Sequence, residues 1–175
     1  LIVVNKSQSF MKIKWVDTHC HLQLLNKNLD KNHFKNIEFL IIPGVDVESS
    51  SKAKEISSSL EVESYWSAGL HPHDAKLLDT QRHDLEKLFV EADLIGETGL
   101  DFYRNLSTKE EQRENFLFHL EFSKQLNKPI IIHCRDSFQD TFDLLVEFNN
   151  PSSVILHSWT CLLYTSPSPR AHEQS

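Results

Sequence analysis

Short apolar runs, rich in Val, Ile and aromatic residues, alternate along the chain with longer stretches whose apolar positions recur at helical spacing. Six runs are predicted to be strands, at residues 14–19, 39–45, 65–70, 93–96, 129–133 and 154–157. Four stretches between them are predicted to be helices, at residues 47–60, 80–92, 108–125 and 137–148. Strands that alternate with helices are typical of a parallel sheet with crossover connections, so we expect an α/β fold.

Two of the predicted helices carry further patterns. Ser107 followed three residues later by Glu110 has the spacing of a capping box, and Asp136 is placed to accept a backbone hydrogen bond where the next helix starts. One apolar face recurs every four residues and is predicted to pack in the core rather than stack on bases, at Phe118, Phe122 and Leu126.

The four glycines all fall at the ends of predicted strands, at Gly44, Gly69, Gly96 and Gly99. Glycine is favoured where a chain turns sharply or approaches a ligand closely. The sequence contains neither a nucleotide-binding Gly-rich loop nor a Gly-x-Ser-x-Gly nucleophile elbow, which argues against kinase-like and serine-hydrolase functions.

His19 and His21 flank Cys20 at the end of the first predicted strand. The two-residue period of a strand points both imidazoles to one side and the Cys20 thiol to the other, into the core. A single His-x-His is equally compatible with half-buried or surface histidines, so it does not define a metal site alone.

Further candidate ligands follow later predicted strands: Glu97, His133 and His157. The carboxyl ends of parallel barrel strands converge on one face, and imidazole and carboxylate suit zinc, manganese or iron. Glu97 is the expected catalytic position, since a carboxylate there can bridge two ions roughly 3.5 to 4 Å apart and so support attack by activated water. The remaining helical or polar histidines are expected to be solvated: His33, His83 and His119.

Three other side chains are expected around the same opening as substrate contacts: His71, Asp101 and Arg135. The planar fork of Arg135 suits a phosphate oxygen, although a salt bridge to Asp101 is an alternative. A structural role is preferred for His73 and Arg104.

The formal net charge of −7 over 175 residues argues against a module that holds nucleic acid mainly through basic residues, so any attraction to DNA must be local. The apolar start, residues 1–4, is too short for a signal peptide or a membrane span, which favours a cytoplasmic protein. Cys20, Cys134 and Cys161 form no disulfide framework, and we expect reduced thiols.

Both ends of the sequence are expected to be non-native. Met11 is the preferred start, which makes residues 1–10 upstream sequence, and the barrel is expected over 11–160. Residues 161–175 begin CLLYTSPSPR, which resembles a translated sequencing-library adapter; a Ser/Pro-rich disordered tail is the alternative.

Five motifs, taken in order, resemble the TatD-type metal-dependent deoxyribonucleases: DTHCHL at 17–22, GLHP at 69–72, IGETGLD at 95–101, KPIIIHCRD at 128–136 and ILHSWT at 155–160. The resemblance covers about 11–160. It implies a TIM-type (β/α)₈ barrel that binds two or more divalent ions (zinc, magnesium or manganese) and cleaves DNA, often as an exonuclease. The family's ligand pattern carries over to His19, His21, Glu97, His133 and His157.

The sequence departs from the family in two places. Ser158 and Trp159 stand where members usually show Cys-Phe, and the family's last ligand, an aspartate in Thr-Asp-x-Pro, is absent. Such barrels run to about 250 residues, so we expect about six of eight strand–helix units with open first and last strands. The 175-residue chain is expected to be poorly folded and inactive, and the full-length parent to hydrolyse DNA.

Two other functions remain open. One is an amidohydrolase-like barrel acting on a small amide, lactone or phosphotriester, although many of these bridge their metals with a modified lysine rather than a glutamate. The other is a non-catalytic fragment that binds a partner through its open strand edges, whereas the nuclease interpretation predicts no stable protein partner. The sequence leaves open the metal, DNA against RNA, exo- against endonuclease action, and the oligomeric state.

Overall fold

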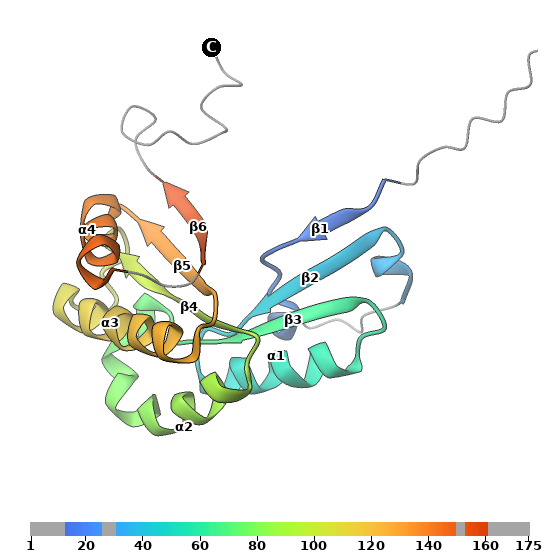
Figure 1. Cartoon of the computed structure of the whole chain (residues 1–175), viewed down its shortest axis with the longest axis horizontal. Helices are drawn as coiled ribbons and strands as arrows, with labels where there is room; N and C mark the ends of the chain where they lie inside the picture. The colour runs from blue at the N-terminus through green and yellow to red at the C-terminus, as the bar shows by residue number, and fades with distance from the viewer. Residues whose placement is uncertain (1–12, 26–30, 150–152, 161–175) are drawn as a thin grey trace, which may run out of the picture.

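Six parallel strands form one curled sheet in the computed structural model, which describes residues 13–25, 31–149 and 153–160 (Figure 1). The expectations for residues 1–10, Cys161 and 161–175 lie outside these ranges. The strands are β1 (Trp15–Asp17), β2 (Ile37–Pro43), β3 (Glu63–Ala68), β4 (Leu94–Asp101), β5 (Ile130–Arg135) and β6 (Val154–Thr160). They lie side by side in chain order, so β1 and β6 are the two edges, as expected for an incomplete (β/α) barrel.

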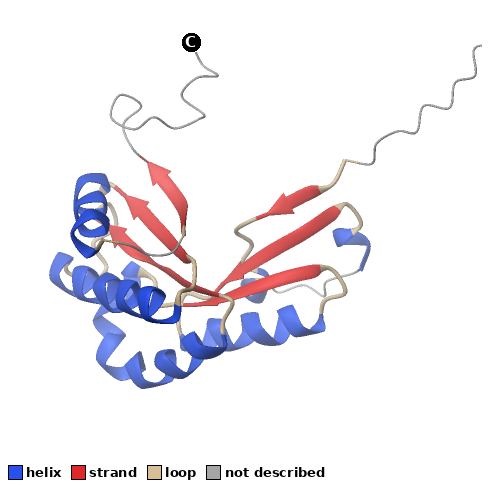
Figure 2. Cartoon of the chain, viewed as in Figure 1, coloured by secondary structure: helices blue, strands red, loops and turns tan. Residues whose placement is uncertain are grey.

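The α-helices lie together on the outer side of the curl (Figure 2). They are α1 (Val47–Ser59), α2 (Leu78–Glu91), α3 (Lys109–Leu126) and α4 (Phe138–Phe148), each within three residues of its predicted bounds. Three 3₁₀ helices were not predicted: η1 (Leu22–Leu24), η2 (Lys31–Phe34) and η3 (Pro72–Leu77). Among the described helices, none combines the length and the apolar character that crossing a membrane requires.

Strand β4 is longer than predicted, because its glycines lie inside the strand instead of ending it. Gly96 and Gly99 have φ values of 111° and 130°, and pairing with β5 resumes at Thr98 after a register shift. A Cβ atom added to Gly99 would lie 2.2 Å from the carbonyl oxygen of His133. Glycine therefore allows β4 to run close beside β5 as far as Asp101, which is buried.

The predicted caps of α3 and α4 are wrong in detail. The Thr108 hydroxyl accepts from the Glu111 backbone N–H at 3.2 Å, and the Glu111 carboxylate accepts from the Thr108 N–H at 2.7 Å, so the capping box lies one residue later than expected. The Ser107 hydroxyl instead donates to the His73 carbonyl. Asp136 does not cap α4: the N-cap is Ser137, whose hydroxyl donates to the Leu100 carbonyl at 2.8 Å and makes no capping bond to the helix.

The apolar face of α3 packs in the core, as predicted. The Phe118 ring lies 5.6 Å from that of Phe89 and 5.1 Å from that of Phe122, and Leu126 packs against the same cluster. His119 extends this buried face, which contradicts the expectation that it is solvated; His33 and His83 are exposed. A histidine beside apolar residues on a helix is ambiguous in sequence, because its position on the helix alone does not say whether a partner lies opposite.

Burial lowers the pKa of His119 to about 4, so this residue predicts a pH dependence of stability. Between pH 6.5 and 4 the unfolded chain takes up a proton that the folded chain excludes, so the free energy of unfolding falls as the pH falls. The contribution of His119 is on the order of 3 kcal/mol. Urea unfolding of the wild-type chain and of His119→Gln across this range measures it, and equal pH slopes for the two chains would contradict it.

Lys128 closes the carboxyl end of α2 from a distance. Its ammonium group donates to the carbonyl oxygens of Phe89, Val90 and Ala92 at 2.8, 2.7 and 2.5 Å. The last carbonyls of a helix lack partners within the helix, and a positive charge there also complements the helix dipole. The β5 end of the sheet and α2 are thereby tied together.

Replacing Lys128 with Met is expected to reduce the free energy of unfolding by about 1–3 kcal/mol, because two half-buried carbonyls and one exposed carbonyl lose a charged donor. Chemical denaturation measures the loss. Lys124→Met is the matched control, since this exposed lysine lies in the last turn of α3, 5.3 Å from the centroid of the Phe148 ring, and no described hydrogen bond joins its ammonium group to a helix carbonyl. A loss of equal size in both variants would rule out the capping role.

Candidate metal centre

Glu97 lies at the middle of a group of histidines where the carboxyl ends of the strands meet. Its side chain is only 3% exposed, and five imidazoles come within 3.9 Å of its carboxylate oxygens. These belong to His19, His21, His71, His133 and His157. An open hollow of about 290 Å³ beside the group is lined by several of them and by Val45, His73 and Asp74.

One side of the Glu97 carboxylate faces His19 and His21. Oxygen Oε2 lies 3.2 Å from His19 Nε2 and 3.5 Å from His21 Nε2, and the two nitrogens are 3.0 Å apart. Ligand atoms 2.0 to 2.1 Å from a tetrahedral zinc ion lie about 3.3 Å from one another. The three atoms are therefore spaced as ligands of one ion.

These two histidines follow β1 rather than ending it, because the strand stops at Asp17. His21 precedes η1, and its Nδ1 lies 3.1 Å from the Pro43 carbonyl oxygen, which can only accept a hydrogen bond. The carbonyl thus holds the proton on Nδ1 and leaves the lone pair of Nε2 directed at Glu97. The His19 and His21 side chains therefore converge on Glu97 as expected. They do so from the loop after β1, and not from alternate positions of a strand as the sequence suggested.

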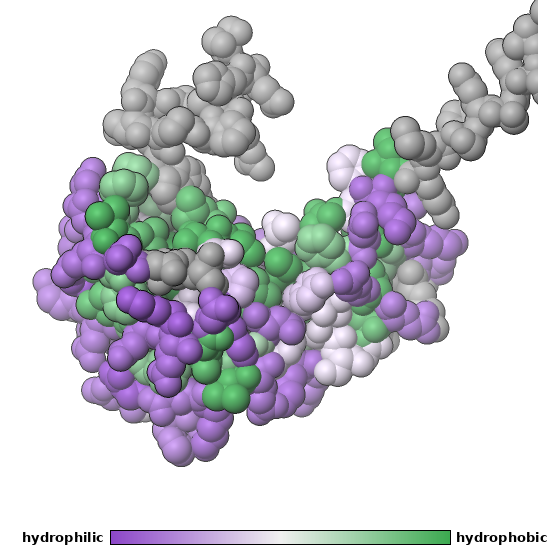
Figure 3. All heavy atoms as spheres, viewed as in Figure 1, coloured by the Kyte–Doolittle hydropathy of each residue, from purple (hydrophilic) through white to green (hydrophobic). Residues whose placement is uncertain are grey.

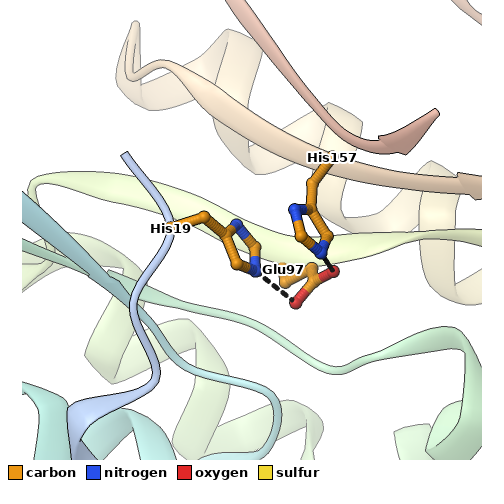
Figure 4. A group of neighbouring side chains, drawn as sticks. All are labelled: His19, Glu97 and His157. Atoms are coloured by element: carbon orange, nitrogen blue, oxygen red, sulfur yellow. Dashed lines mark ion pairs between the residues drawn. The ribbon is translucent and has the colours of Figure 1, made fainter. Parts of the chain in front are cut away.

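His157 of β6 reaches the same carboxylate from the opposite edge of the sheet (Figure 4). Its Nε2 lies 3.9 Å from Glu97 Oε1, and its ring stacks on that of His19 with centroids 3.4 Å apart and planes 3° from parallel. His19, Glu97 and His157 together form one group whose ligand atoms lie close enough to share an ion.

A second group with the same property consists of His71, Glu97 and His133. Glu97 Oε1 lies 3.1 Å from His133 Nδ1 and 3.8 Å from His71 Nε2. Since Glu97 belongs to both groups, its two oxygens are placed to bridge two ions.

The electrostatics of the cluster favour neutral imidazoles at His71 and His157 beside an ionised Glu97 carboxylate. Burial lowers the pKa of His71 to about 3, and burial together with the neighbouring His19 lowers the pKa of His157 to about 4. Burial alone would raise the pKa of Glu97, but the close contacts of its carboxylate with the rings of His133, His19 and His21 outweigh burial and hold the pKa below its usual range. Neutral imidazole and ionised carboxylate are the forms that bind metal ions, because each presents a lone pair that an ion can accept.

Asp101 supports this cluster from behind. Its buried carboxylate lies 3.0 Å from His133 Nε2 and 2.8 Å from His73 Nε2. The backbone N–H groups of Tyr103 and Arg104 donate to its other oxygen at 3.1 and 2.9 Å. If the Nε2–H of His133 donates to Asp101, the lone pair of its Nδ1 is directed at Glu97, which is the arrangement in which a carboxylate orients a metal-binding histidine.

Comparison with known proteins places the chain in a family. A family model described as TatD related DNase matches residues 16–164. The chain belongs to this family. A metal-dependent hydrolase of Buchnera aphidicola subsp. Baizongia pistaciae (strain Bp) is 34% identical over 161 residues, which cover 83% of this chain and 59% of that protein. The 3'-5' ssDNA/RNA exonuclease TatD of Escherichia coli K12 is 34% identical over 126 residues, covering 69% of this chain and 48% of that enzyme.

The solved structures agree on the fold. YjjV, a TatD homolog from Escherichia coli K12, superposes with a TM-score of 0.77 at 21% identity, covering 87% of this chain and 63% of YjjV. This TatD-family chain thus spans about half to three fifths of the length of the curated relatives described here. It belongs to a family of metal-dependent hydrolases with a TIM-barrel fold.

His73 is the site residue that the sequence interpretation of this TatD-family chain passed over. A structural role was preferred for it, yet it shares the carboxylate of Asp101 with His133 and its ring lies 4.2 Å from that of His71. The His-Pro-His spacing in residues 71–73 was a visible indication, because η3 begins at Pro72 and turns both rings toward the opening. Arg104 has an exposed side chain, in line with the role preferred for it.

Arg135 and Cys20 have other partners. The Arg135 guanidinium lies 4.0 Å from the centroid of the Tyr103 ring, while the described partners of the Asp101 carboxylate are His73, His133 and two backbone N–H groups. These contacts do not match the salt-bridge alternative. The Cys20 thiol donates to the Ile41 carbonyl at 3.2 Å, and burial raises its pKa to about 12, so it packs with the core as predicted.

Proposed function

We propose that the whole protein hydrolyses phosphodiester bonds of DNA, as an exonuclease, with two or more divalent ions held by His19, His21, Glu97, His133 and His157. The observation that carries the proposal is the bridging position of Glu97 between two groups of histidine nitrogens. Zinc, magnesium and manganese are the candidate ions. When bound, such ions supply a water-derived nucleophile near neutral pH and offset charge that develops on the phosphate.

The chain's own residues have distinct parts in this proposal. Glu97 would hold the ions and is the proposed catalytic position, and Asp101 would keep the His133 ring in place. Arg135 would donate two parallel hydrogen bonds to a phosphate oxygen, and the Tyr103 ring beneath it limits the directions in which the guanidinium can point. His71, at the lip of the hollow, would contact the substrate beside the scissile bond.

Nucleic acid is the favoured substrate because relatives are named for it. TatD of Escherichia coli K12 is described as a 3'-5' ssDNA/RNA exonuclease. The net charge of −7 opposes long-range attraction to DNA, so recognition in this proposal is confined to the centre and Arg135. This fits an enzyme that takes one strand end at a time better than one that grips a long duplex.

The proposal is tested with the gene product extended to the length of its relatives. DNA strands labelled at the 3' or the 5' end are incubated with Mg²⁺, Mn²⁺ or Zn²⁺, with EDTA as the metal-free control. We expect metal-dependent release of terminal nucleotides, which Glu97→Gln abolishes. Turnover of a lactone or dihydroorotate panel with no release from DNA would favour the amidohydrolase alternative and contradict the proposal.

The 175-residue chain assayed alone is expected to show no turnover, because β1 and β6 leave the barrel open on the side where His19 and His157 face each other. A stable complex with another protein and without metal would instead support the non-catalytic alternative. Metal content measured by elemental analysis alongside size-exclusion chromatography separates these two results.

A further inference from the structure

Helix α3 buries a row of polar side chains on the face that meets the sheet. Gln112, Asn115, His119 and Ser123 follow one another at helical spacing, and each is fully buried. Buried polar groups are costly unless they are hydrogen-bonded, so a row of four needs a set of partners. Each of the first three forms a hydrogen bond with the backbone of Leu70 or Asp101, residues that adjoin or belong to the candidate metal centre.

Two of these side chains hold the Leu70 backbone from both sides. The Asn115 side-chain amide donates to the Leu70 carbonyl at 2.7 Å, and the Leu70 N–H donates to His119 Nε2 at 3.0 Å. His119 Nδ1 lies 2.7 Å from the Asn115 carbonyl oxygen, which can only accept. That carbonyl fixes the proton on Nδ1 and leaves Nε2 free to accept, so the tautomer is set by the helix itself.

Leu70 needs these partners because it lies between β3 and η3, where neither element pairs its backbone. The next residue is His71, whose N–H donates to the Val45 carbonyl at 2.9 Å and whose ring faces Glu97 and His133. The Leu70 N–H, the Leu70 carbonyl and the His71 N–H are thus all hydrogen-bonded, which fixes the backbone from which the His71 ring extends into the hollow.

Gln112 grips Asp101 in the same way, one turn earlier on α3. Its side-chain oxygen accepts from the Asp101 N–H at 2.8 Å, and its amide donates to the carbonyls of Asp101 and Ser107 at 3.2 and 2.9 Å. Both backbone groups of Asp101 are therefore bound by a helix that contributes no residue to the centre.

We infer that Gln112, Asn115 and His119 of α3 are positioning residues, which set His71 and Asp101 in place around the centre through the Leu70 and Asp101 backbones. The inference rests on the proposed metal centre. Side chains that orient ligands from outside typically change metal affinity 10- to 100-fold when removed. Ser123 belongs to the same buried row but donates to the Lys128 carbonyl, away from the centre, so it should have no such effect.

The test compares zinc binding to the 175-residue chain and to variants by titration calorimetry. Asn115→Leu and His119→Leu are expected to weaken zinc binding about tenfold. His119→Gln, whose side-chain oxygen can still accept from Leu70, should recover part of that loss. Ser123→Ala is the matched control: it should lower the unfolding temperature, because the hydrogen bond to the Lys128 carbonyl is lost, and leave the zinc dissociation constant unchanged. Wild-type affinity in both leucine variants, or equal losses in Ser123→Ala, would overturn the inference.

A second measurement compares the unaltered chain with two of the variants and does not depend on metal. The Leu70 and Asp101 amide protons should resist hydrogen exchange, and the His71 and His133 rings, whose centroids are 4.5 Å apart, should show a nuclear Overhauser effect that His119→Gln largely preserves and Asn115→Leu reduces. Rapid exchange at both amides would contradict the inference even if the leucine variants do not fold. If the unaltered chain binds no zinc, the proposed centre fails, and the ring contact alone then decides whether α3 positions His71.

Discussion

The Glu97→Gln chain is expected to bind no divalent ion tightly. Glu97 is the residue shared by both groups of candidate ligands, with oxygens within 3.2 Å of His19 and His133. An amide has only one oxygen and carries no charge. Its NH₂ group would also point at the histidine nitrogens that the proposal assigns to the ions. Both groups therefore lose a ligand and the charge between them, and elemental analysis after dialysis should show the metal content fall from about two ions per chain to near zero.

Glu114→Gln is the matched control for this change. Glu114 is exposed on α3 and pairs with Arg82 at 3.2 Å, so it loses the same charge far from the cluster. Its metal content should equal that of the wild-type chain. Retention of both ions by the Glu97 variant, with unchanged dissociation constants, would show that the histidines bind metal without this carboxylate and would remove the bridge from the proposal.

Asp101→Asn is expected to produce the second-largest effect, a 10- to 100-fold loss of metal affinity. The wild-type carboxylate accepts from His73, from two backbone N–H groups and from the side of His133 that faces away from Glu97. The amide has one acceptor atom, while both histidines contact Oδ2 and both backbone N–H groups contact Oδ1. An amide oxygen that keeps the two backbone hydrogen bonds therefore presents its N–H groups to both histidines, and the His133 ring turns. The His133 lone pair then loses its direction toward Glu97.

Zinc competition with a chromogenic chelator measures the loss, and His73→Gln separates its causes. His73 contacts Asp101 but does not approach Glu97 among the described ion pairs, so its removal should weaken binding by less than Asp101→Asn does. An equal effect would mean that His73 itself binds an ion. Unchanged affinity in Asp101→Asn would show that His133 is held by packing alone.

The sequence predicted the strand–helix alternation, the edge positions of β1 and β6, and the residues around Glu97. These depend on periodicity and on the convergence of parallel strands, which act over whole elements. What it missed depends on single contacts between distant residues. Gly96 and Gly99 were taken to end β4, yet they allow its close approach to β5.

His119 and His73 illustrate the same limit in opposite directions. His119 was expected in solvent because its partner, the Leu70 backbone, lies 49 residues away and has no side-chain pattern that announces it. A structural role was preferred for His73, and the path of η3 brings its ring and that of His71 to one opening. The cap of α3 lies one residue later than predicted for a simpler reason. Ser107 and Thr108 both suit the N-cap, but the Ser107 hydroxyl donates to the His73 carbonyl, so Thr108 caps the helix.

The stacked rings of His19 and His157 join the two arms of an otherwise open sheet. Hydrophobic residues gather along the upper side of the molecule, over the strands (Figure 3), and the edge strands leave Trp15 63% and Leu156 45% exposed. An ion shared by His19, Glu97 and His157 would cross-link the two edges of the sheet and close a loop from residue 19 to residue 157. Chelation would then let the arms splay apart, so the radius of gyration measured by small-angle scattering should grow when EDTA is added, before any helix melts.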